Sequence, residues 1–272
     1  MMWNFLRPKR REWFIASIAI GALSLATFAV VSWRTPWAPG RVWGLVFGTI
    51  AASVFVVDGL YPIRRRLMGW PFGTAQRWLQ FHLYGGVLAV LFVLIHVGFR
   101  LPAGQFGWWL FVLVLWTTAT GLAGVWLQKW VPAMLASQLS VEAIYERIPD
   151  MATRLQTEAD AIVRGSSDVL ERFYSGEVRP SLAGVAPSWA FLADLRGGRA
   201  RRLAPFRNVE PFLSDEDRDR LRDLEAVVTE KVELDAHYSA QRALRLWLPV
   251  HLFPAMALLG LLAVHVLAVA YL

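Results

Sequence analysis

The stretch "HLYGGVLAVLFVLIH" (residues 82–96) is a run of apolar side chains with a histidine at each end. The stretch "HLFPAMALLGLLAVH" (251–265) repeats this arrangement with the same spacing of 14 residues. Fourteen helical residues rise about 21 Å and rotate to within about 40° of four whole turns, so both rings of each stretch lie on one helix face. Two such helices predict pairs of imidazole rings at two levels of a helical bundle.

The composition places these helices in a membrane protein. The chain is 56% hydrophobic, with a mean hydropathy of +0.41, which is too apolar for an ordinary soluble domain. A hydrocarbon core about 30 Å thick takes roughly 20 helical residues to cross. Five stretches are long enough: 13–33, 42–61, 78–99, 107–127 and 246–271.

We therefore predict an all-α, polytopic membrane helix bundle in contact with lipid. Residues 1–128 form transmembrane helices 1–4, residues 129–245 form a helical insert, and residues 246–272 form the fifth transmembrane helix. We interpret 13–33 as an uncleaved first span, because it is longer than the apolar region of a secretory signal and no clear cleavage site follows it.

The positions of the positive charges predict the orientation, because Lys and Arg near span ends stay on the cytoplasmic side. Basic residues cluster before the first span and after the second: Arg7, Lys9, Arg10, Arg11, Arg64, Arg65, Arg66 and Arg77. The short loops on the other side carry only Arg34, Arg41 and Arg100. We expect an inner (cell) membrane protein whose N-terminus and 129–245 insert are cytoplasmic and whose C-terminus is outside.

With this orientation the third and fifth spans run in the same direction. His82 and His251 then form an inner pair, and His96 and His265 form an outer pair. An ionisable residue inside a span is costly and usually functional, and neutral imidazole is a good iron ligand. A lone intramembrane histidine is more often only hydrogen-bonded, but two equally spaced pairs on parallel spans favour metal ligation.

Several further residues could serve a flat cofactor. Gly85 and Gly86 follow His82 on its own face, where they would leave room for a porphyrin edge; close helix packing is the alternative. Arg100, four residues after His96, could meet a haem propionate or anchor the span end in the headgroups. Asp58, the acid inside a span, is expected to pair with Arg64–Arg66, with a proton or quinone site as the alternative.

The composition also excludes chemistry. Without cysteine, the chain has no thiolate-ligated iron–sulfur cluster and no covalent c-type haem. The insert holds 17 of the 28 basic and 19 of the 21 acidic residues, so it carries −2 and the remainder +9. The basic balance therefore reflects membrane topology, and we expect no nucleic-acid partner.

The H-x13-H pattern on two spans resembles the haem-bearing core of the di-haem b-type cytochromes. Both spacings match the cytochrome b subunit of quinol–cytochrome c reductases, and the ferric reductase and NADPH oxidase superfamily is similar but less close. The resemblance covers spans three to five. It implies that His82, His96, His251 and His265 are axial ligands of two stacked haems b. The quinol-oxidation signature P-E-W-Y is missing, and the 129–245 insert has no counterpart in cytochrome b.

The insert itself is predicted to be helical. Ser140 would cap a first helix, Pro149 would interrupt it, and a second helix would run from 151 to Gly165. A loop is expected over 174–213. Ser214 would then cap a long helix, with Asp217 at the capping-box position, that leads almost unbroken into the fifth span. Its apolar stripe is Leu221, Leu224, Val228 and Val232, and His237 on this helix is expected to be a surface histidine rather than a metal ligand.

These features predict an electron-transfer subunit of an oxidoreductase complex rather than a complete enzyme, since no flavin or nicotinamide domain follows the fifth span in this sequence. It would pass electrons between a quinone or cytoplasmic donor and an external acceptor. We expect partner redox subunits, with a c-type cytochrome or an iron–sulfur protein as candidates. The alternatives are a stand-alone quinol-dependent or ferric-reductase-like oxidoreductase, and a haem-free anchor or transporter.

Overall fold

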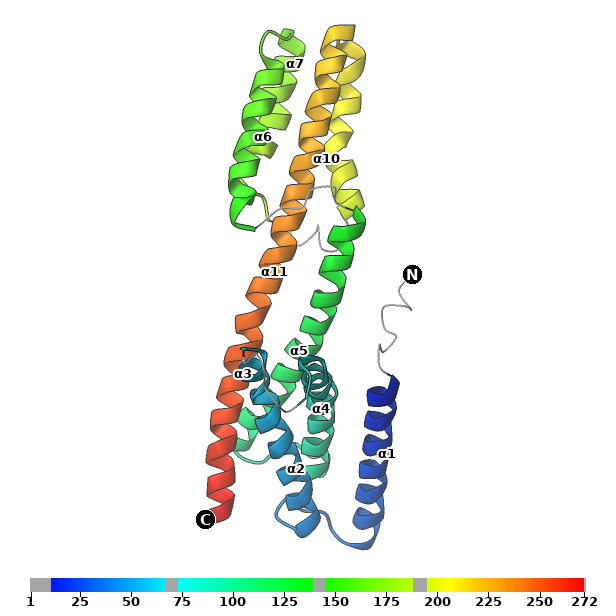
Figure 1. Cartoon of the computed structure of the whole chain (residues 1–272), viewed down its shortest axis with the longest axis vertical. Coiled ribbons are helices and arrows are strands. Elements are labelled where there is room, and N and C mark those ends of the chain that lie inside the picture. The colour runs from blue at the N-terminus through cyan, green and yellow to red at the C-terminus, as the bar shows by residue number, and fades with distance from the viewer. Residues whose placement is uncertain (1–10, 67–72, 139–144, 188–194, 272) are drawn as a thin grey trace. The chain divides into compact units, whose positions relative to one another are not determined.

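The computed structural model describes residues 11–66, 73–138, 145–187 and 195–271, and the regular structure within these ranges is helical. The chain divides into two compact units. Unit 1 comprises Met1–Val125 and Trp247–Leu272, and unit 2 comprises Trp126–Leu246. Figure 1 shows the helices of both units in chain order.

The predicted all-α fold with five long apolar helices is confirmed. Each of the five is long and apolar enough to cross a membrane. At most 22% of the most apolar stretch of any of them is buried within the structure, so their outer surfaces are apolar and suited to lipid. Their bounds are α1 (Arg11–Arg34), α2 (Val42–Gly59), α4 (Ala75–His96), α5 (Gln105–Gln138) and α11 (Asp215–Tyr271).

Within unit 1, α4 packs against both α2 and α1, and Figure 1 shows α2 and α4 side by side. The short helix α3 (Tyr61–Arg66) continues from α2. Phe47, Ala51, Phe92 and Ile95 form the buried contact between α2 and α4. This close pairing places the two ends of α2 beside the two histidines of α4.

The junction of α5 and α11 in unit 1 depends on a proline. Pro254 lies inside α11 and has no N–H, so it leaves the carbonyl of Val250, four residues earlier, without its helical donor. The indole Nε1 of Trp116 on α5 donates to this carbonyl at 3.1 Å. A side chain of a neighbouring helix thus satisfies a backbone group that could not bond to water in a bilayer.

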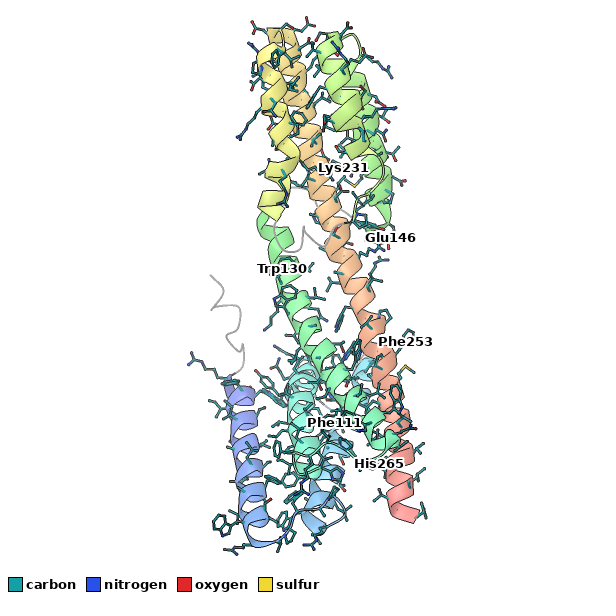
Figure 2. All side chains as sticks on the ribbon, turned by 180° about the vertical axis from the view of Figure 1, so that it is seen from behind. Phe111, Trp130, Glu146, Lys231, Phe253 and His265 are labelled. Atoms are coloured by element: carbon teal, nitrogen blue, oxygen red, sulfur yellow. The ribbon has the colours of Figure 1, made fainter. Side chains whose placement is uncertain are left out.

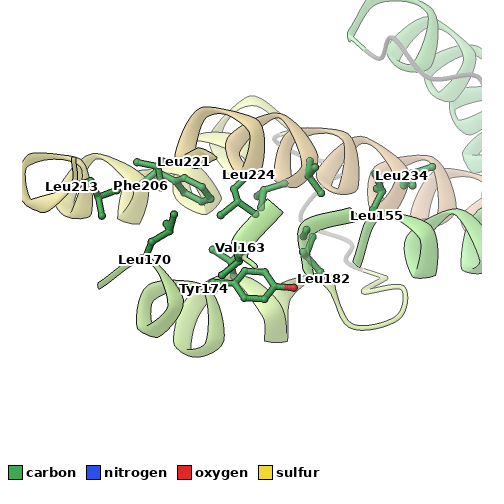
Figure 3. Packing of buried hydrophobic residues seen from close by; sticks show 14 of the residues in the cluster. Leu155, Val163, Leu170, Tyr174, Leu182, Phe206, Leu213, Leu221, Leu224 and Leu234 are labelled. Carbon is green, nitrogen blue, oxygen red and sulfur yellow. The ribbon is translucent and has the colours of Figure 1, made fainter. Parts of the chain in front are cut away.

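Unit 2 is a helical bundle with a conventional apolar core. It contains α6 (Ile148–Val163), α7 (Asp168–Phe173), the π-helical turn η3 (Tyr174–Val178), α8 (Arg179–Leu182), α10 (Leu195–Val209) and the first part of α11. Figure 3 shows Val163 and Leu170 across from Leu221 and Leu224 of α11, and Leu155 beside Leu234 of the same helix. The predicted stripe of α11 is confirmed, since Leu221, Leu224, Val228 and Val232 are all buried.

The predicted boundaries in unit 2 are partly correct. The hydroxyl of Ser214 accepts from the backbone N–H of Asp217 at 3.3 Å and caps α11 as expected. Gly165, with a positive φ of 75°, follows the end of α6. Pro149 occupies the first turn of α6, where a missing N–H costs nothing, so it starts this helix and does not interrupt one. Ser140 lies outside the described residues.

Two expectations for unit 2 are wrong. The segment 174–213 is not a loop, because α8 and α10 lie within it. Phe206 of α10 is buried against Phe173, with ring centroids 5.1 Å apart, so tertiary packing overrides the low helix propensity of its glycines and Pro205. His237 is not on the surface, because only 5% of it is exposed.

Candidate functional site

The structure brings the inner pair of histidines together. His82 lies near the start of α4 and His251 lies on α11, and their ring centroids are 6.3 Å apart with the ring planes at 84°. These residues are 169 positions apart in the sequence. The third and fifth predicted spans are thus neighbours at this level, as the spacing argument expects.

Two residues on α5 and α11 hold the ring of His251. The hydroxyl of Thr120 lies 3.0 Å from Nδ1 of His251. Trp247 stacks on the ring with centroids 5.6 Å apart and planes 13° apart, and its Nε1 donates to the carbonyl of Thr120 at 2.6 Å. The indole fits over Gly124, where a Cβ would lie 2.0 Å from it. Any side chain at position 124 would displace Trp247.

The ring of His82 lies between α4 and the end of α2. Its Nδ1 is 3.7 Å from Oδ1 of Asp58, a carboxylate that is only 9% exposed. Tyr61 stacks on the other side of the ring, with centroids 5.1 Å apart and planes 14° apart. The expectation that Asp58 pairs with the Arg64–Arg66 cluster is not met at Arg64, whose Nη2 donates to the carbonyl of Gly73. The side chains of Arg65 and Arg66 lie outside the described part.

His96, in the outer pair, is fixed against the first turns of α2. Its Nδ1 lies 2.8 Å from the carbonyl oxygen of Gly44. The ring packs against Gly48, where a Cβ would lie 2.8 Å from Nδ1. Trp37 donates from Nε1 to the backbone carbonyl of His96 at 3.3 Å, which ties the end of α4 to the loop before α2.

His265 lies near the end of α11, where Figure 2 labels it. Its ring stacks with Phe106 of α5, with centroids 6.1 Å apart. Figure 1 shows α4 and α11 running in the same direction within unit 1.

The Nδ1 contacts determine which nitrogen of each ring carries a proton. A backbone carbonyl can only accept, so His96 must donate from Nδ1 to Gly44. The hydroxyl of Thr120 also lies 2.8 Å from the carbonyl of Trp116. When its single proton goes to that carbonyl, it accepts from Nδ1 of His251. In both rings Nε2 then carries a lone pair and is available as a ligand.

The other predicted site residues have packing contacts. Gly85 faces Val54 of α2, and Gly86 faces Asp58, each with 3.4 Å between the site of a Cβ and the neighbouring side chain. Both contacts agree with the close-packing alternative, and a role beside a porphyrin stays a prediction. Arg100 is exposed in the turn after α4, and its contact with a propionate also stays a prediction.

Sequence reasoning missed the residues that hold the rings. Thr120, Trp247, Gly44, Gly48 and Gly124 all contact a site histidine or a side chain stacked on one. Small residues spaced along α2 and α5 were the available signal, since they permit close approach in membrane bundles. The signal does not show which ring each glycine accommodates, because that depends on helix rotation.

Comparison with known proteins gives no relative from which a function could be transferred. No protein-family model matches the chain, and neither a curated protein nor a solved structure is significantly similar to it.

Proposed function

We propose that this chain is a di-haem b-type electron-transfer subunit of a membrane oxidoreductase complex. His82 and His251 would ligate one haem iron, and His96 and His265 would ligate the other. The observation that carries the proposal is the inner pair, in which the ring centroids of two histidines from different helices lie 6.3 Å apart.

This separation would allow both imidazoles to hold one haem iron. A metal–imidazole bond is about 2 Å long, and a ring nitrogen lies roughly 1 Å from its ring centre, so two imidazoles that hold the same metal would have ring centroids roughly 6 Å apart. The described residues contain no group of three or more His, Cys, Asp or Glu able to hold a bare ion. Two imidazoles suffice for haem, because the porphyrin supplies the other ligands.

When bound, haem supplies reversible one-electron exchange. The residues of this chain hold and orient the ligands. The carbonyl of Gly44 and the hydroxyl of Thr120 keep Nδ1 protonated, so that Nε2 remains free to ligate. The stacked rings of Tyr61, Trp247 and Phe106 restrict the imidazoles to one orientation. Two levels about 21 Å apart along α4 would divide the membrane crossing into shorter steps.

Haem stoichiometry tests the proposal directly. The purified protein should show a b-type reduced-minus-oxidised spectrum, and extraction should give two non-covalent haems per chain. His96→Ala should lose one of the two, whereas His237→Ala, which changes the histidine outside unit 1, should keep both. A wild-type protein without a b-type band, or with a single haem, would contradict the proposal.

The proposed setting is an inner membrane, with the N-terminus and insert cytoplasmic and the C-terminus outside. Partner redox subunits would dock on unit 2 and on the outer face, and a quinone is a further candidate ligand. Turnover of quinol with ferric chelates by the isolated chain would instead favour a stand-alone oxidoreductase. Full stability without haem would favour an anchor or a transporter, in which Asp58 and His82 would begin a proton path.

A further inference from the structure

His82 differs from His96 and His251 in the chemistry of the group that lies beside Nδ1. Nδ1 of His96 faces a neutral carbonyl, and Nδ1 of His251 faces a neutral hydroxyl. Nδ1 of His82 faces the Asp58 carboxylate at 3.7 Å. This distance is slightly longer than a direct hydrogen bond, but a small rotation of either side chain would close it. Among these three rings, His82 alone faces a formal negative charge.

The structure around Asp58 places its carboxylate beside this ring. Asp58 lies at the end of α2, 9% exposed, and Tyr61 covers the ring of His82 one turn later. Gly86, one turn after His82 on α4, has its Cβ position 3.4 Å from Oδ2 of Asp58. A branched or longer side chain at 86 would therefore occupy the space of the carboxylate. Burying an acid in a bundle costs several kcal/mol unless it is paired, so an acid at this position beside a candidate ligand points to a role for its charge.

A carboxylate that accepts from the second nitrogen of a ligating histidine makes that ligand a stronger electron donor. A nearby negative charge also favours the oxidised iron, which carries one more positive charge than the reduced iron. Both effects act in the same direction, and both lower the reduction potential. Neither acts on the outer pair through a described contact, because Asp58 lies at the opposite end of α2 from Gly44.

We infer that Asp58 is a positioning residue for His82 that makes the inner haem site lower in reduction potential than it would be with a neutral partner. This inference rests on the proposed function. The inference adds a direction of electron transfer to that function, because an electron leaving the inner site for an otherwise similar outer site would move downhill in free energy.

Potentiometric titration of the haem spectrum in the full-length protein tests the inference. Asp58→Asn keeps the shape and removes the charge, so one of the two midpoint potentials should rise while the other stays unchanged. Asp58→Glu restores the charge and should keep the wild-type midpoint. Ser53→Ala, on the same helix and away from the ring, should change neither. A two-haem Asp58→Asn protein with both midpoints unchanged, or with both shifted equally, would overturn the inference.

The outcomes separate the inference from the proposed function. Wild-type protein without two haems would refute the function itself, whereas two haems with an insensitive midpoint would refute only the role of Asp58. If Asp58→Asn does not assemble, Asp58→Ser provides a second test, because it removes the charge and leaves a smaller polar side chain. The same single midpoint should rise, with Ser53→Ala again as the control. An unchanged midpoint in Asp58→Ser would overturn the inference.

Discussion

The two units have opposite distributions of apolar and polar residues. Unit 2 buries apolar residues in its interior and exposes most of its charges, the distribution typical of a bundle in water. Unit 1 exposes most of its apolar residues and keeps polar rings between its helices. In a bilayer, a polar group inside unit 1 would have no water to bond to, so its partners would have to come from neighbouring helices. Polar residues there are consequently more informative about function than those of unit 2.

One buried charge pair of unit 2 and two histidines of unit 1 differ in their hydrogen bonds. In unit 2, Nζ of Lys231 lies 2.7 Å and 2.8 Å from the two oxygens of Asp235, which also accepts from the N–H of Ala186. Both charged groups of this pair are hydrogen-bonded, and we interpret the pair as structural. In unit 1, Nδ1 of His96 and of His251 has a partner, whereas no described group bonds to Nε2 of either ring. A metal-ligand site in an apolar bundle requires a ring nitrogen of this kind, without a hydrogen-bond partner.

The largest expected effect is on His96, whose Nε2 has no described hydrogen-bond partner. Gly48→Ala would place a Cβ 2.8 Å from Nδ1 of His96, so the ring must leave the carbonyl of Gly44. We expect loss of one of two haems, measured by extraction from the purified protein. The matched control is Gly260→Ala, where no atom lies within 4 Å of the new Cβ. Equal haem content in the two variants would show that the ring position is not essential.

Substitutions in the Lys231–Asp235 pair of unit 2 should change stability and leave haem binding unchanged. Lys231→Met leaves the carboxylate of Asp235 buried without its cation, which typically costs about 3–5 kcal/mol. The double variant Lys231→Met/Asp235→Asn removes both charges, keeps an acceptor for Ala186, and should recover most of this loss. Hydrogen exchange of the amides in α6 and α11 measures the change, and haem content should not fall. A double variant as unstable as the single one would refute the charge-pair explanation.

A substitution beside His251 that leaves the packing intact should have an intermediate effect. Thr120→Val keeps the shape but removes the acceptor of Nδ1 of His251. Loss of such a partner usually weakens metal binding 10–100-fold, so we expect easier haem loss in a competition assay with apomyoglobin. Thr120→Ser should restore binding. Thr117→Val is the control, because the hydroxyl of Thr117 bonds only to carbonyls of its own helix in the described structure.

Much of this arrangement was predictable from apolar length and histidine spacing. The five long apolar helices follow from patterns within single segments, because a helix has a fixed rise and rotation. The adjacency of His82 and His251 follows from their spacing together with the span directions that the positive charges predict. The apolar stripe from Leu221 to Val232 was predictable for the same reason. The helical nature of 195–209 was not, because its stability comes from the burial of Phe206 against a distant helix.

The partners of the rings could not be predicted for a related reason. Asp58 was assigned to nearby arginines because they are close in sequence, whereas the structure places it beside His82, 24 residues away. The acceptor for His96 is the backbone of Gly44, and a carbonyl leaves no signature in a sequence. The mixed charges of the helix predict a surface position for His237, but all positions from 231 to 237 are buried.

The smallest expected effect concerns a polar cluster of unit 2 that water reaches. The hydroxyl of Tyr174 donates to Asp160 at 2.6 Å, and Arg179 lies 3.2 Å from the same oxygen. The hydrogen bond from Tyr174, and then that from Arg179, hold the pKa of Asp160 below its ordinary value. The ionised form of Asp160 is therefore stabilised in the folded state. This contribution to stability is present above the ordinary pKa and lost as the pH falls through the lowered pKa.

Asp160→Asn should cost less than about 1 kcal/mol of folding stability at neutral pH, as expected for a pair that water screens. In urea titrations it should also flatten the loss of stability between roughly pH 5 and pH 3. A loss as large as that of Lys231→Met would mean that exposure to water does not distinguish the two clusters, and the contrast between screened and buried polar groups would fail within unit 2 itself.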